Sequence, residues 1–165
     1  MIKKLLLAIL IAIPSFGFAQ AKFGVIHTET LMSEMPEIKE VQAALEASSK
    51  KYEDEFNVLR EEFDKLYAEL QKLDETTPQT IKDRRIAELQ DKDTRIQQFR
   101  KTSMEDLQRQ EMQLMAPIRE KINQAIQAVG KEGGFTFLFE DTMPIYVGTD
   151  VTDVTSLVKA KLGMK

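Results

Sequence analysis

The stretch YEDEFNVLREEFDKLYAELQKL, residues 52–73, decides the fold. A set of large apolar residues in it is spaced alternately four and three positions apart, which makes a heptad seam that requires a partner helix. The other positions are rich in Glu, Asp, Lys and Gln and suit faces in water. The stretch therefore predicts a long helix paired along one side, with a seam formed by Tyr52, Phe56, Leu59, Phe63, Leu66, Leu70 and Leu73.

Around this stretch, residues 36–130 are predicted to form two helical arms with one break, the tip, near residues 74–78. Pro36 suits the first position of a helix, where no hydrogen bond is lost, and an acidic neighbour suits the positive end of the helix dipole. Thr77 and Pro78 suit the start of the second helix in the same way. Because the connection is short, the two arms must run antiparallel.

The seam is less regular away from residues 52–73. The first arm slips by one residue at the polar pair Ser48-Ser49. The second arm has an 11-residue repeat, which is typical of a nearly straight helix, formed by Ile96, Leu107, Ile118 and Val129. Apolar residues are sparse between Arg100 and Gln113. We expect the hairpin to be firm near its root and looser further out.

Residues 1–21 have the three parts of a secretory signal peptide. Lys3 and Lys4 precede an apolar run, and small residues follow that suit cleavage after Ala19 or Ala21. The run is too short for a spanning helix, which needs about 20 apolar residues. The sequence therefore predicts export across the inner membrane and a periplasmic location.

Residues 22–35 and 131–165 are predicted to form a small β/α body. It would contain a strand from Lys22 to His27 and a C-terminal β-hairpin made of residues 135–140 and 145–148. Phe135, Phe137 and Phe139 are expected on one face of their strand. Such a sheet has open edges and many exposed aromatic side chains. Strands from other subunits of a homo-oligomer would cover both. The residues expected at this interface between subunits are Phe23, Val25, Phe135, Phe137, Phe139, Ile145, Tyr146 and Val147.

The fold class is therefore α+β and predominantly helical: a long antiparallel hairpin rooted in a small β body that self-association completes. Without its first 21 residues the chain has a net charge of −6, because Lys3 and Lys4 are lost. This acidity argues against nucleic-acid partners and against contact with anionic lipid or lipopolysaccharide.

Composition also excludes several kinds of site. The chain has no Cys and one histidine, His27, so thiolate metal sites, disulfides and histidine clusters are excluded. No catalytic set is present, and we expect no enzymatic activity, metal or cofactor. We interpret His27 as structural or surface-exposed. On the second arm, Met104, Met112 and Met115 with Phe99 are candidates for contact with apolar segments of a partner protein, or else fill gaps in the seam.

The order of these features resembles the Skp/OmpH family of periplasmic chaperones. The resemblance rests on the opening strand Phe23–Ile26, the run from Pro117 through Val129, the turn Glu132-Gly133-Gly134, the aromatic strand after it, and the segments Ile145–Val147 and Asp153–Thr155. It implies a homotrimer whose helical hairpins enclose a cavity. It also implies an ATP-independent holdase that keeps unfolded outer-membrane proteins from aggregating. The alternative is a periplasmic coiled-coil scaffold or spacer that binds one fixed partner.

Overall fold

The computed structural model describes residues 21–164, so the predicted signal peptide lies almost wholly outside the described residues. The elements follow in the order β1 (Phe23–Ile26), α2 (Thr28–Glu34), α3 (Pro36–Gln71), α4 (Gln79–Glu132), β2 (Phe137–Glu140), β3 (Thr152–Asp153) and α5 (Thr155–Lys161). Among these residues no helix is long and apolar enough to cross a membrane. The predicted fold class, mainly helical with a small β region, is confirmed.

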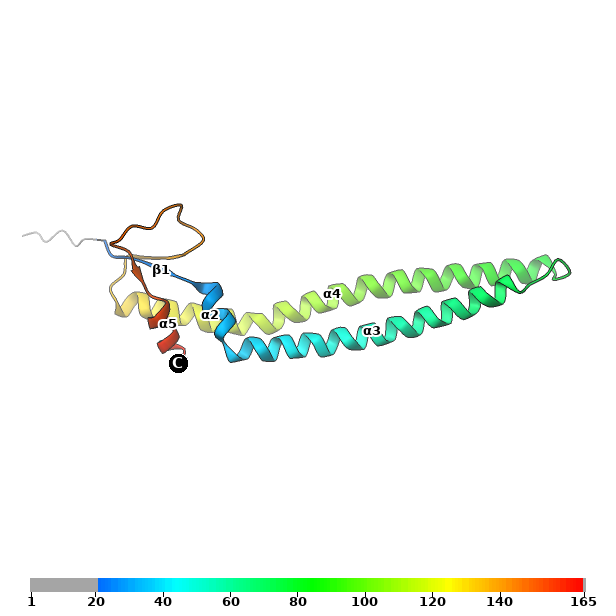
Figure 1. Ribbon diagram of the computed structural model, residues 1–165, viewed down its shortest axis with the longest axis horizontal. Coiled ribbons are helices and arrows are strands. Elements are labelled where there is room, and N and C mark those ends of the chain that lie inside the picture. The colour runs from blue at the N-terminus through cyan, green and yellow to red at the C-terminus, as the bar shows by residue number, and fades with distance from the viewer. Residues whose placement is uncertain (1–20, 165) are drawn as a thin grey trace, which may run out of the picture. The chain divides into compact units, whose positions relative to one another are not determined.

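The chain divides into two compact units, which we name by their content. The hairpin unit is Glu29–Gln124, and the body unit combines residues 21–28 with Ala125–Gly163. In the hairpin unit α3 and α4 lie side by side and are joined by a loop at one end (Figure 1). The Asp74 side chain holds this loop by accepting hydrogen bonds from the backbone N–H groups of Thr76 and Thr77, at 3.0 and 3.1 Å.

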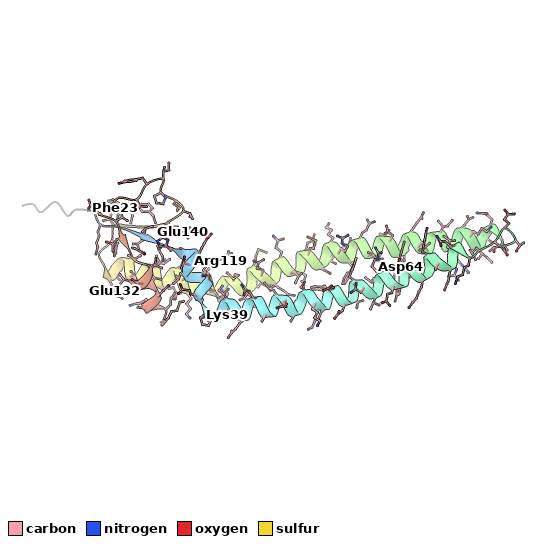
Figure 2. The ribbon with its side chains drawn as sticks, viewed as in Figure 1. Phe23, Lys39, Asp64, Arg119, Glu132 and Glu140 are labelled. Atoms are coloured by element: carbon pink, nitrogen blue, oxygen red, sulfur yellow. The ribbon has the colours of Figure 1, made fainter. Side chains whose placement is uncertain are left out.

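The heptad seam predicted in α3 is confirmed. From residue 51 to residue 73, only the seven seam residues named above are buried or half-buried, and every other side chain is exposed. Figure 2 shows side chains standing out along both helices of the hairpin unit, with the exposed residues Lys39 and Asp64 labelled on α3. Because only one stripe of each helix is covered, the pairing of α3 with α4 is what stabilises both of them.

All four members of the 11-residue repeat predicted for the second arm, Ile96, Leu107, Ile118 and Val129, are buried or half-buried. Between residues 82 and 110, however, α4 also has a heptad line of buried and half-buried side chains that alternate three and four positions apart, at Lys82, Arg85, Leu89, Lys92, Ile96, Phe99, Ser103, Asp106 and Gln110. Leu107 lies beside this line. Many of the seam positions are polar, so a pattern based on apolar residues alone could not reveal the heptads.

Two basic seam residues of α4 reach partners on α3. The Lys92 ammonium lies 2.6 Å from the Glu62 carboxylate, and the Arg85 guanidinium lies 3.6 Å from that of Glu69. The hydrogen bond from Lys92 lowers the pKa of Glu62 below its ordinary value. Both pairs are exposed, so water and salt screen their attraction strongly. They fix the register of the arms more than they stabilise them.

The body unit is built on a three-stranded sheet of order β2-β1-β3, in which both pairings are parallel. The register places Gly24 opposite Leu138 and Phe23 opposite Phe137. Leu138 fills the space above Gly24 and reaches the end of α4, since a Cβ on Gly130 would lie 3.3 Å from its Cδ1. One face of the sheet is therefore covered by this helix segment. The other face carries aromatic rings.

The predicted C-terminal β-hairpin is wrong. Residues 145–148 form no strand, and the third strand is instead Thr152–Asp153, which pairs with β1 in parallel. Ile145 and Tyr146 are 107% and 83% exposed. Their strand-like sequence therefore belongs to an exposed apolar loop and not to a hydrogen-bonded strand. The short strand β3 carries no apolar signal, and its pairing with a segment about 128 residues earlier is invisible to local pattern.

Phe135 also lies elsewhere than predicted. Gly134 has a φ of 65°, so the chain turns there and regular strand structure starts only at Phe137. The Phe135 ring lies close to the Cα positions of Gly24 and Gly133, with the Lys22 ammonium 4.1 Å from its centre. It therefore shares the face of Leu138, and only Phe137 and Phe139 point to the opposite face.

Candidate functional site

An aromatic face, formed by Phe23, Phe137 and Phe139, covers the free side of the sheet. The register of β1 and β2 brings the rings together, with centroids 6.1 Å apart for Phe23 and Phe137 and 5.9 Å apart for Phe137 and Phe139. The three side chains stay 39%, 57% and 38% exposed. Figure 2 labels Phe23 at the start of β1 and Glu140 at the end of β2, the two ends between which the face extends. Exposed rings packed in a row are typical of a surface that another protein covers.

A cavity of about 210 Å³ adjoins the aromatic face. The loop at residues 141–151 closes it from one side, and its lining is almost wholly apolar: Phe23, Gly24, Val25, Phe139, Pro144, Tyr146, Val147 and Val151. The same loop exposes Met143 and Ile145 to solvent. The aromatic face and this loop thus form one continuous apolar surface on the body unit.

A second apolar surface lies on the hairpin unit, where a groove of about 290 Å³ opens between α3 and α4. Phe99 and Tyr52 meet edge to face in it with centroids 6.1 Å apart, and the Arg100 guanidinium lies 5.9 Å from the centre of the Phe56 ring. The complete lining is Ser49, Tyr52, Glu53, Phe56, Phe99, Arg100, Ser103 and Met104. We name it the Ser103 groove.

A neighbouring groove continues the Ser103 groove along the hairpin. It has a volume of about 370 Å³ and shares Ser49 with the first. Its other lining residues are Leu45, Glu46, Leu107, Gln108 and Glu111. The slip in the seam at Ser48-Ser49 explains both, because two small polar side chains leave space where a heptad position would otherwise hold a large apolar residue.

Tyr52 ties the floor of the Ser103 groove to the opposite helix through a hydrogen bond to the Asp106 carboxylate. This bond raises the pKa of the Tyr52 hydroxyl above its ordinary value and lowers that of Asp106. Asp106 also accepts from the Gln110 amide at 2.9 Å and lies 3.0 Å from the Arg109 guanidinium. A polar network therefore borders the groove on one side, and the edge-to-face rings of Tyr52 and Phe99 border it on the other.

The Ser103 hydroxyl is buried in this groove without a hydrogen-bond partner. Leaving a buried hydroxyl unpaired costs about 1–3 kcal/mol. We expect Ser103→Ala to raise the free energy of unfolding by about 1 kcal/mol, since it removes the unpaired group and only one atom of volume. Chemical denaturation followed by circular dichroism measures this. Thr102→Ala is the matched control, because that exposed hydroxyl already donates to the Gln98 carbonyl. An equal gain in both variants would contradict the assignment.

Comparison with known proteins identifies the fold. The family model described as outer membrane protein (OmpH-like) matches residues 22–162. The chain belongs to the OmpH-like family. A crystal structure from Caulobacter crescentus CB15, described as an OmpH-like outer membrane chaperone, superposes on it with a TM-score of 0.71. That structure is 19% identical in sequence, and the match covers 87% of this chain and 85% of the other. No curated protein matches the sequence.

The resemblance to the Skp/OmpH family stated from the sequence is thus confirmed. The OmpH-like fold places six of the eight expected interface residues on the apolar surface of the body unit: Phe23, Val25, Phe137, Phe139, Tyr146 and Val147. Ile145 lies in the same loop and is fully exposed. Phe135 is the exception, because it lies on the opposite face of the sheet.

Two of the four residues predicted as candidates for client contact lie in the same groove. Phe99 and Met104 line the Ser103 groove, and Met104 is 70% exposed on its rim. Met112 is exposed and Met115 half-buried, and both lie outside the lining. Sequence reasoning missed Tyr52, Phe56 and Ser103 as groove residues. The signal that could have found them is the slip at Ser48-Ser49, which marks where the two arms pack poorly.

No group of three His, Cys, Asp or Glu side chains that could hold a metal ion occurs among residues 21–164. The pKa shifts of Tyr52 and Asp106 at the Ser103 groove arise chiefly from the hydrogen bond between their two side chains. Apolar surfaces with charged rims are what the described residues offer to a ligand.

Proposed function

We propose that this OmpH-like chain is an ATP-independent holdase chaperone of the periplasm. In this proposal it binds unfolded outer-membrane proteins between its helical arms and prevents their aggregation. The observation that carries the proposal is the Ser103 groove with its neighbour, an apolar floor open to solvent on a helical hairpin. Aromatic rings and a flexible methionine accept many apolar side chains, as a holdase with varied clients requires.

The rims of the grooves support weak and broad binding. Glu53 and Arg100 line the first groove and Glu46 and Glu111 the second, so a client segment that follows both grooves meets both charges close to apolar surface. Interactions of this kind are individually weak and can be exchanged, which suits capture and release without an energy source. The proposal includes no metal, cofactor or catalytic step, and no nucleic-acid or lipid partner.

The proposal also includes a homotrimer formed through the aromatic face and the 141–151 loop. In a single chain this surface leaves Phe137 and Tyr146 57% and 83% exposed, and both edges of the sheet are open. Burying apolar area stabilises an assembly by about 25 cal/mol per Å². Cyclic symmetry would cover every copy of the surface equally. Several hairpins held at one body would then enclose a client between them.

An aggregation assay tests the holdase proposal. We expect the chain without residues 1–21, in molar excess as trimer, to suppress the light scattering of an outer-membrane β-barrel protein diluted from urea. Ser103→Leu is expected to fill the groove and to weaken suppression, while Ser103→Ala keeps the groove open and preserves suppression. Failure of the unsubstituted chain to suppress aggregation would overturn the proposal. Equal suppression by the leucine variant would remove the Ser103 groove from client binding.

One observation favours the alternative of a scaffold. Arg100 and Met104 line the first groove, and Leu107 and Glu111 line the second, seven positions further along α4. Side chains on one face of a helix also recur about every seven residues, so a single partner helix could fit into both grooves. A pull-down from solubilised periplasm distinguishes the two, since a scaffold retains one partner and a holdase retains many unrelated barrel proteins.

A further inference from the structure

The seam of the hairpin unit has two flanks, and they carry different side chains. On one flank, Glu62 and Glu69 of α3 each precede a seam residue, and they pair with Lys92 and Arg85 of α4. From one ion pair to the next, both partners move by seven positions in opposite directions. The two helices therefore keep an antiparallel heptad register toward the tip, where they remain side by side (Figure 1).

The opposite flank, which we name the groove flank, consists of residues that directly follow a seam residue. Two of its members, one on each helix, line the Ser103 groove, and the heptad register places the others opposite each other toward the tip. Because successive levels are seven residues apart, each lies about 10 Å beyond the last. From the groove to the tip, the levels are Glu53 with Arg100, Arg60 with Asp93, and Tyr67 with Ile86.

The outermost level of the groove flank is apolar. Tyr67 is 48% exposed and Ile86 is 42% exposed, although both helices are otherwise rich in charged residues. The ring of Phe63 stacks on that of Tyr67 with centroids 6.4 Å apart and planes 5° apart. We name these three residues the tip patch. Together they expose more apolar surface than a single scattered side chain would, which is typical of a place that a partner covers.

The spacing of the two apolar places matches an extended peptide. The tip patch lies two heptads beyond Glu53 and Arg100, which is about 21 Å along the hairpin. An extended chain rises about 3.3 Å per residue and directs every second side chain to the same face, so its first and seventh side chains lie about 20 Å apart on one face. Arg60 and Asp93 stand between the two places, are exposed, and offer one charge of each sign.

We propose that the groove flank binds one extended client segment at two places. An apolar side chain of the client enters the Ser103 groove, and the side chain six positions away packs on the tip patch. Polar side chains between them meet Arg60 and Asp93, whose opposite charges accept either sign. This inference rests on the proposed holdase function, because an unfolded client is what supplies segments without fixed secondary structure.

The groove flank suits other ligands less well. Glu53 and Asp93 would repel an anionic lipid. A helix would need apolar side chains 14 positions apart to reach both places, because it rises only about 1.5 Å per residue. Forming such a helix from an unfolded client also carries the cost of helix nucleation. An extended segment reaches both places with seven residues and without that cost.

Peptides of graded spacing test the inference on the chain without residues 1–21. Each peptide has a tryptophan at one end, a leucine four, five, six or seven positions further on, and serine and threonine elsewhere, which are poor helix formers. We expect the spacing of six to bind about threefold to tenfold more tightly than the others, as burial of one more apolar side chain allows. Tryptophan emission reports binding, since the chain has no tryptophan.

Methyl NMR of the same samples locates the bound peptide. With the spacing of six, we expect the signals of Met104 at the groove and Ile86 at the tip patch to shift together. Tyr67→Gln and Ile86→Gln should each remove the preference for this spacing and leave the shift at Met104. The matched controls are Val58→Gln on α3 and Ile81→Gln on α4, which are 50% and 38% exposed and lie outside the groove flank. Both controls should keep the preference.

Three outcomes would overturn the binding at two places. They are the absence of a preferred spacing, an equal loss in the control variants, and tighter binding of a helical peptide with apolar side chains 14 positions apart. The aggregation assay on the same samples keeps this inference separate from the holdase proposal. A chain that suppresses aggregation without preferring the spacing of six overturns only the inference. A chain that prefers this spacing but fails to suppress aggregation overturns only the holdase function.

Discussion

Replacing Phe137 by aspartate is expected to reduce the mass measured by light scattering from about three subunits to one. Phe137 is the most exposed ring of the aromatic face, at 57% in the single chain. A charge there meets water in an isolated subunit and costs little. In an assembly that covers the face, the same charge is buried without a partner, which costs about 3–5 kcal/mol per subunit. The substitution therefore separates assembly from folding.

Val58→Asp is the matched control for this prediction. Val58 is also half exposed, at 50%, and lies on α3 outside the seam of the hairpin unit. We expect this variant to keep the mass of the unsubstituted chain. Circular dichroism should show that both variants retain their helix content. A Phe137→Asp variant that stays fully assembled would place the interface elsewhere.

The second large effect is expected in the hairpin seam, where Ile122→Asp should strongly destabilise the helices. Ile122 is 3% exposed and sits one turn from Ile118, which is 6% exposed. The substitution removes apolar burial and leaves a carboxylate among aliphatic side chains. Together these effects should lower the free energy of unfolding by about 3–5 kcal/mol. Because a hairpin has a single seam, no second core compensates.

Ile86→Asp makes the same chemical change on the same helix at a site that is 42% exposed. We expect it to alter the free energy of unfolding by no more than about 0.5 kcal/mol, as surface substitutions usually do. Thermal unfolding followed at 222 nm compares the two variants directly. If Ile86→Asp proved as costly as Ile122→Asp, the burial along α4 would have to be reassigned.

The first arm could be predicted residue by residue, whereas the second could not. In α3 the seam residues from Tyr52 to Leu73 are all apolar, so sequence spacing and burial coincide. In α4 the seam passes through Arg85 and Lys92, whose charged ends reach acids on α3 while their stems cover the seam. A search for apolar residues alone finds gaps at those two positions. The apolar residues of α4 that remain follow the 11-residue repeat instead of the heptads.

The C-terminal strands of the body unit were predicted wrongly for a different reason. Residues 145–147 are apolar and β-branched or aromatic, which is the pattern of a strand, but they form an exposed loop. Thr152 and Asp153 have no such pattern, and yet they pair with β1. Likewise, nothing local predicts that His27 meets Asp141 and Asp153. These contacts join segments more than 110 residues apart, and only the assembled sheet brings them together.

The placement of β1 at the centre of the sheet has a consequence for the order of folding. Both partners of this strand come from residues 137–153, so the first strand to be synthesised must wait for nearly the whole chain. The two arms, by contrast, meet across a short loop and can close early. Contacts between distant segments form more slowly than local ones. A nascent chain should thus hold its arms before it holds its sheet, and self-association would begin only after synthesis is nearly complete.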